Sequence, residues 1–142
     1  MSLGAYNLDE GRPVDVIKEI MDKLNVNTFT VMGFSCGGGV AISLSLKYST
    51  RIEKIVLYMA SYTDDTQADM LMRQIKQNSL ILWFREDQIH SYKLGRYFHK
   101  VLENSEHVES SCGVFEICKA KFNYEAYRHL TIPIIVDFLK RN

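Results

Sequence analysis

The sequence predicts an α/β protein: a three-layer sandwich in which helices cover both faces of a mainly parallel sheet. Apolar runs typical of strands alternate along the chain with runs whose apolar residues have helical spacing. The strand-like runs are almost continuously apolar, as expected of parallel strands that are buried on both faces. A length of 142 residues fits one domain, so we expect a single domain over residues 1–142.

The first helix is predicted to end at Leu24 and to lead into the first strand. Pro13 suits the first turn of this helix, and Asn25 can end it. The apolar residues at helical spacing are Val16, Ile17, Ile20, Met21 and Leu24. The first strand is then expected at Thr28–Met32.

Further helices and strands are expected to alternate to the end of the chain. The strands are predicted at Lys54–Met59, Ser79–Phe84 and, more weakly marked, Glu106–Ser111. The helices are predicted at Gly38–Tyr48, Gln67–Gln77, Leu94–Leu102 and Tyr124–Lys140. Pro133 should interrupt the last helix with a kink, because proline lacks the N–H of a helical hydrogen bond.

One motif stands between the first strand and the helix that follows it. Gly33-Phe34-Ser35-Cys36-Gly37 has the pattern G-x-S-x-G in a strand–turn–helix setting. Small residues at Gly33 and Gly37 would let the chain turn sharply and expose the Ser35 hydroxyl on a strained corner. The backbone N–H of Cys36 would then point at an oxyanion formed there. The alternative is a serine in an ordinary glycine-rich loop.

An acid and several bases are candidates to act with Ser35. Asp87 follows the third strand, at the sheet edge where the carboxyl ends of parallel strands meet, and could orient a histidine; it could also be a plain loop residue or a helix cap. His90 lies at this edge, although a loop histidine three residues after an aspartate is usually only solvated. The other histidines, assigned to helices or to the fourth strand, are His99, His107 and His129.

Composition argues against several classes of partner. Lysine plus arginine and aspartate plus glutamate both number 17, and no basic stripe occurs, so we expect no nucleic-acid partner. No apolar run is long enough to span a membrane, and no secretory signal is visible. Cys36, Cys112 and Cys118 lack metal-like spacing, so we expect no metal, no cofactor and reduced thiols in the cytoplasm.

The stretch Asp9–Leu46 resembles the α/β-hydrolase family of the short-lid type in its helix, strand and elbow. Leu80–Ile89 resembles the acid loop of that family, with Asp87 at the acid position, and Ile134–Leu139 resembles its terminal helix. The resemblance implies a serine hydrolase acting on a small ester or related acyl substrate. Ser35 would be its nucleophile, Asp87 its acid and the Cys36 N–H an oxyanion donor.

The chain departs from the family pattern in two ways. The family histidine follows the last strand in a Gly-His-aromatic setting, and the nearest match, Cys112–Phe115, has Val114 at that position. The family also has four strands before the elbow strand, with a loop that supplies a second oxyanion N–H. The alternative is therefore a catalytically impaired hydrolase-like binding domain, or a fragment, that lacks the base and the second donor.

The missing strands have a structural consequence for Thr28–Met32. This strand is central in the family, so here it would form an edge of a partial α/β-hydrolase sheet that lacks the N-terminal strands. Exposed apolar edges tend to pair with other chains. We therefore expect a homodimer through this edge, or a fragment that needs its missing half.

Overall fold

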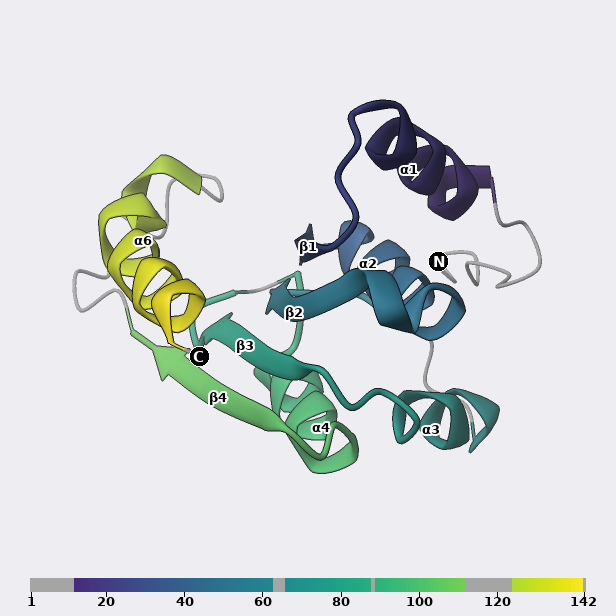
Figure 1. Cartoon of the computed structure of the whole chain (residues 1–142). Coiled ribbons are helices and arrows are strands. Elements are labelled where there is room, and N and C mark those ends of the chain that lie inside the picture. The colour runs from purple at the N-terminus through teal and green to yellow at the C-terminus, as the bar shows by residue number, and fades with distance from the viewer. Residues whose placement is uncertain (1–11, 63–65, 88, 112–123, 142) are drawn as a thin grey trace.

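A four-stranded parallel sheet forms the centre of the computed structural model (Figure 1). The model describes residues 12–62, 66–87, 89–111 and 124–141. In spatial order the strands are β1 (Phe29–Phe34), β2 (Ile52–Tyr58), β3 (Asn78–Phe84) and β4 (Ser105–Ser110). Because all four strands are parallel, the loops that follow them open at one edge of the sheet, as predicted.

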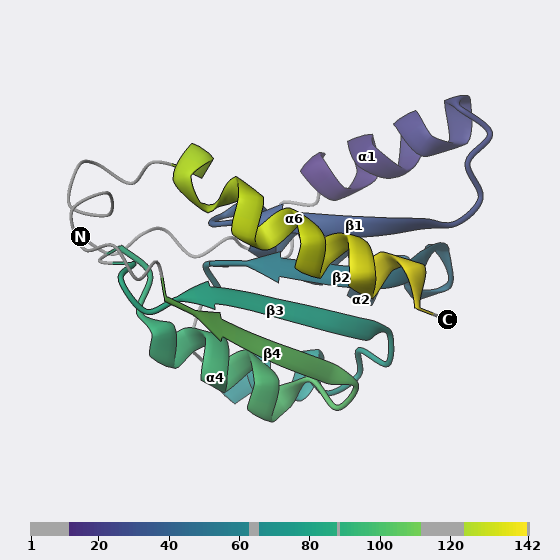
Figure 2. The same ribbon diagram turned by 90° about the vertical axis from the view of Figure 1, so that its left-hand side faces the viewer.

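Helices cover both faces of this sheet, which confirms the three-layer α/β sandwich. The helices are α1 (Arg12–Lys23), α2 (Gly37–Lys47), α3 (Thr66–Met72), α4 (Tyr92–Val101) and α6 (Tyr124–Lys140). On one face, α2 packs against β1 and β2, and α4 packs against β3 and β4. On the opposite face α6 crosses the strands (Figure 2).

The two central strands explain the continuous apolar runs. β2 and β3 each have a neighbouring strand on both sides and carry almost only buried residues after their first positions. The side chains of Leu57, Trp83 and Phe98 have no measurable exposure. Burial on both faces therefore accounts for the lack of polar alternation in these strands.

One expected helix differs from the prediction. The helix expected at Gln67–Gln77 ends at Met72, and Ile75 is buried after the chain has left the helix. The helical spacing therefore predicted the burial of Ile75 correctly, but the backbone at this residue is not helical. The last helix, α6, has its predicted bounds and continues through Pro133, and the kink there stays a prediction. Tertiary contacts hold its end, where Lys54 Nζ donates to the carbonyl of Phe138 at 3.0 Å.

The first strand of the sheet lies at an edge, as predicted. β1 pairs with β2 alone among the described strands. The Met32 side chain of this strand is 44% exposed. Met32 is in register with Val56, so its side chain lies on the same face of the sheet as that of Lys54, which contacts α6.

Within the described residues, no helix is long and apolar enough to cross a membrane.

Candidate active site

Ser35 occupies a strained corner between β1 and α2. Its φ angle is 50°, a left-handed conformation that a residue with a side chain seldom adopts. The corner is held by the backbone: the Ser35 N–H donates to the Tyr58 carbonyl at 3.3 Å, and the Ser35 carbonyl accepts the N–H groups of Gly38 at 2.9 Å and Ser61 at 2.8 Å. Backbone strain of this kind costs about 1–3 kcal/mol and persists only when its surroundings impose it.

Two glycines make this corner possible, and only one of them was predicted. A Cβ on Gly33 would lie 2.3 Å from the carbonyl oxygen of Gly37, so the two backbone segments meet too closely for any side chain. A Cβ on Gly38 would lie 2.2 Å from the Cβ of Ala60, whereas one on Gly37 would meet nothing within 4 Å. The close approaches therefore require glycine at positions 33 and 38, not at 37.

The structure brings together the three side chains singled out in the sequence. Ser35 Oγ lies 2.9 Å from His90 Nε2, and His90 Nδ1 lies 2.9 Å from Asp87 Oδ2. Ser35 follows β1, whereas Asp87 and His90 belong to the loop after β3, two strands away. The serine, imidazole and carboxylate thus form one continuous hydrogen-bonded chain at the carboxyl edge of the sheet.

The Asp87 carboxylate shapes the loop as well as contacting the imidazole. Asp87 Oδ1 accepts the backbone N–H groups of Ile89 at 2.8 Å and His90 at 3.0 Å, an Asx-type turn. Asp87 Oδ2 then faces His90 Nδ1. Since a carboxylate accepts only, this network assigns the proton to Nδ1 and leaves Nε2 as the acceptor for the Ser35 hydroxyl.

The interpretation of His90 as a solvated loop residue was wrong. The His90 side chain is 9% exposed, and that of Asp87 has no exposure. The ring of Phe34, next to Ser35, meets the imidazole edge-on at a centroid distance of 6.3 Å. The pair is therefore shielded from bulk water, which strengthens its electrostatic contact.

Cys36 begins the turn into α2, as predicted. Its φ and ψ angles are −60° and −25°, and its side chain is exposed. Within the described part of the chain, the Cys36 N–H donates no hydrogen bond. An unpaired N–H at a helix N-terminus, beside the serine hydroxyl, is suited to bind a developing oxyanion.

The other three histidines lie elsewhere. His99 is on α4 and bonds the Ser105 hydroxyl at 2.9 Å, His107 is in β4, and His129 is exposed on α6. Val114, which occupies the position expected for the family histidine, falls outside the described residues, as do Cys112 and Cys118. Among the described residues, no group of three histidine, cysteine, aspartate or glutamate side chains could hold a metal ion.

Comparison with known proteins agrees with this architecture. Residues 12–73 match the family model described as the alpha/beta hydrolase fold. No match was found among curated proteins. This matched segment contains Ser35 and the whole elbow but neither Asp87 nor His90.

Solved structures share the fold at low sequence identity. A predicted CIB-like hydrolase from Thermoplasma acidophilum is 20% identical with a TM-score of 0.76, and the alignment covers 94% of this chain and 60% of that one. A putative lipase from Acinetobacter baumannii is 14% identical with a TM-score of 0.73, covering 98% and 69%. A meta-cleavage product hydrolase from Pseudomonas fluorescens is 17% identical with a TM-score of 0.64, covering 78% and 65%.

The fold and the serine elbow define the class of this protein. The chain has the alpha/beta hydrolase fold, and its residues 12–73 match the model described by that name. It spans 60% and 65% of the lengths of the Thermoplasma and Pseudomonas hydrolases. The shared fold does not extend to a shared substrate, so the chemistry has to be argued from the site itself.

Proposed function

We propose that this protein is a serine hydrolase that cleaves a small ester or related acyl substrate. Ser35 is the nucleophile, His90 the general base, Asp87 the acid that orients the base, and the Cys36 N–H an oxyanion donor. The observation that carries the proposal is the unbroken chain of 2.9 Å contacts from Ser35 Oγ through the imidazole to the Asp87 carboxylate.

The first half of the reaction forms an acyl-enzyme. Ser35 Oγ attacks the carbonyl carbon of the substrate while its proton passes to His90 Nε2. The tetrahedral oxyanion accepts the Cys36 N–H, and Asp87 stabilises the imidazolium. The bond to the leaving alcohol then breaks, and the alcohol takes the proton from His90, which leaves an ester on Ser35.

The second half regenerates the free serine. A water molecule attacks the Ser35 ester and gives a proton to His90 Nε2. The bond to Ser35 Oγ breaks, the oxygen regains the proton, and the carboxylic acid product leaves. No cofactor takes part in these steps, because every proton moves between the substrate, water, Ser35 and His90.

A fluorophosphonate probe tests the proposal. The probe should label Ser35, and labelling should vanish in Ser35→Ala and fall by several powers of ten in His90→Ala. Ser43→Ala is a matched control, because Ser43 is on α2 and its hydroxyl donates to the Gly39 carbonyl. Absence of labelling at high probe concentration would favour the alternative, a catalytically impaired domain that binds a partner or ligand.

The β1 edge supports a second proposal, a homodimer. Apolar side chains are exposed on β1 and on the helix that precedes it in the chain: Met32, Val16, Ile20 and Leu24. Within the described sheet, β1 has a neighbouring strand on one side only, so a second copy could continue the sheet on the other side. A stable monomer across a wide concentration range in sedimentation would exclude the homodimer.

The cytoplasmic location of the protein stays a prediction from the cysteine usage.

A further inference from the structure

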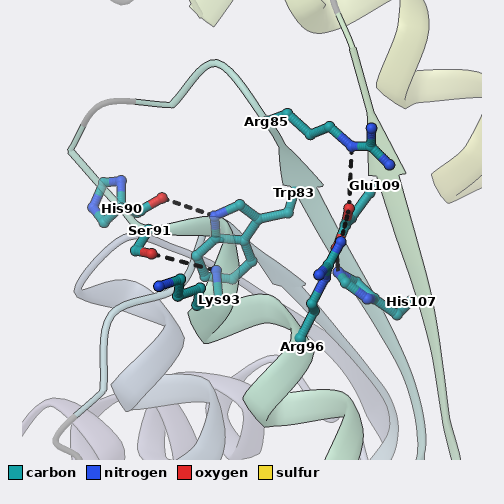
Figure 3. A network of polar contacts seen from close by, with 8 residues as sticks. All are labelled: Trp83, Arg85, His90, Ser91, Lys93, Arg96, His107 and Glu109. Atoms are coloured by element: carbon teal, nitrogen blue, oxygen red, sulfur yellow. Dashed lines mark hydrogen bonds and ion pairs between the residues drawn. The ribbon is translucent and has the colours of Figure 1, made fainter.

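We propose that Trp83 is a positioning residue for His90: its indole N–H fixes the backbone from which the imidazole reaches Ser35. This inference rests on the proposed function, in which His90 is the base. Trp83 Nε1 donates to the His90 carbonyl at 2.9 Å (Figure 3). Nothing in the sequence patterns pointed to Trp83, which was expected only as part of a buried strand.

The indole bond completes the fixation of the His90 backbone. The His90 N–H is held by Asp87 Oδ1 at 3.0 Å, and the His90 carbonyl is held by Trp83. Because the N–H and the carbonyl on either side of the His90 Cα are both hydrogen-bonded, the position and direction of the Cα–Cβ bond are fixed. An imidazole that must satisfy Ser35 and Asp87 together tolerates little backbone displacement.

Trp83 itself is closely packed. Its side chain is fully buried in β3 and packs against Phe98 of α4, with ring centroids 6.2 Å apart. A Cβ on Gly95 would lie 2.8 Å from Trp83 Cε3, so α4 approaches the indole as closely as a glycine permits. The donor that holds His90 is therefore part of the rigid core.

Both ends of the 85–91 loop are also anchored. At its start, the Arg85 N–H donates to the Ser110 carbonyl at 3.1 Å, and Arg85 Nε lies 3.2 Å from Glu109 of β4. Glu109 in turn binds Arg96 of α4 (Figure 3). At the other end, Ser91 caps α4. Between these anchors, the indole bond joins the backbone of His90 to the buried strand β3.

The chain contains one tryptophan, which allows a single-atom test. Expression with 3-benzothienylalanine in place of tryptophan exchanges the Trp83 N–H for sulfur and alters no other residue. Fluorophosphonate labelling should slow about tenfold, the effect expected from one net hydrogen bond. Protein made with 4-fluorotryptophan retains the N–H and should label at the normal rate.

A packing variant separates positioning from general stability. Phe98→Leu removes the aromatic ring that packs against the indole but leaves the Trp83 N–H bond to His90. It should therefore lower the melting temperature without changing the labelling rate. Trp83→Phe should lower the labelling rate. An unchanged labelling rate in the benzothienyl protein would overturn the role of Trp83 and leave the proposed function intact.

A readout that does not depend on activity keeps the two proposals apart. In a ¹⁵N-histidine spectrum, the Nδ1–H proton of His90 bound to Asp87 should resonate far downfield, and it should broaden or vanish in the benzothienyl protein. If the unmodified protein is never labelled, the hydrolase proposal fails, and this signal alone decides the role of Trp83. Persistence of the signal in the benzothienyl protein would refute that role.

Discussion

Asp87 and His90 stand three residues apart in one loop, and the Asp87 carboxylate bonds both the backbone N–H and the ring Nδ1 of His90. The acid and the base therefore form a single local unit. In the family that the chain resembles, the histidine follows the last strand instead. Here the orientation of the base depends on a short turn and on β3, from which the turn extends.

The Asp87→Asn variant should reduce kcat/KM for a short-chain chromogenic ester by about 10⁴-fold. An asparagine oxygen can still accept the two backbone N–H groups, which leaves the amide NH₂ facing His90 Nδ1. The imidazole proton would then sit on Nε2, which could not accept the proton of Ser35. The melting temperature should stay close to that of the unmodified protein.

A matched control for this variant is Asp137→Asn, since the Asp137 side chain on α6 is 74% exposed. Its kcat/KM should be unchanged. Equal activity of Asp87→Asn and the unmodified protein would remove Asp87 from the site.

The elbow glycines should differ in their tolerance of alanine. Gly38→Ala should lower the free energy of unfolding by about 1–3 kcal/mol, because the added methyl group collides with Ala60. Gly37→Ala adds the same methyl group in open space and should leave stability unchanged or slightly raised. Urea denaturation of both variants measures the difference, and an equal loss in both would contradict the packing argument.

Cys36 should be replaceable without loss of activity. The proposed oxyanion donor is its backbone N–H, and the thiol is exposed. Cys36→Ala should therefore retain kcat/KM within a few-fold, and a thiol reagent should not abolish turnover of that variant. A fall to background in Cys36→Ala would show that the thiol takes part in the reaction.

Stability should fall at mildly acidic pH because of His107 in β4. Burial lowers the pKa of His107 below its ordinary value of 6.5, helped by His99 and Arg96 and opposed by Glu109. Within the described residues, His107 Nε2 has no hydrogen-bond partner. As pH falls below about 6.5, the unfolded chain binds this proton before the folded protein does, so the free energy of unfolding should decrease.

Urea denaturation at pH 7.5 and 5.5 measures this effect. In His107→Gln, the loss of stability between the two pH values should be smaller than in the unmodified protein. His129→Gln is the matched control, because His129 is exposed on α6. An unchanged loss of stability in His107→Gln would assign the pH dependence to other groups.

Charge at the β1 edge should weaken self-association. Met32→Lys introduces a charge where the proposed second copy would pack, and its sedimentation should shift toward the monomer. Met70→Lys is a matched control on α3, because its side chain is 65% exposed and lies away from β1. The same association constant in both variants would exclude this edge as the interface.

Local patterns in the sequence determined most of the architecture. Alternating apolar runs gave the layers, because strands buried on both faces cannot carry polar alternation. The motif around Ser35 located the strained turn, since its residue types restrict the local backbone. Asp87 could be placed at the same edge because it directly follows a strand of a parallel sheet. Elements with weaker patterns, such as the helix after Gln67, were predicted with the wrong length.

Only the tertiary structure decided what surrounds Ser35. Whether His90 reaches the serine depends on the alignment of β1, β2 and β3, and no local pattern encodes the distance between loops two strands apart. The need for glycine at position 38 depends on Ala60, which approaches from the segment after β2. The contact of Trp83 with the His90 carbonyl likewise depends on how the loop folds back over β3. The sequence determined which residues lie at the carboxyl edge of the sheet, and tertiary packing decided which of those residues are in contact.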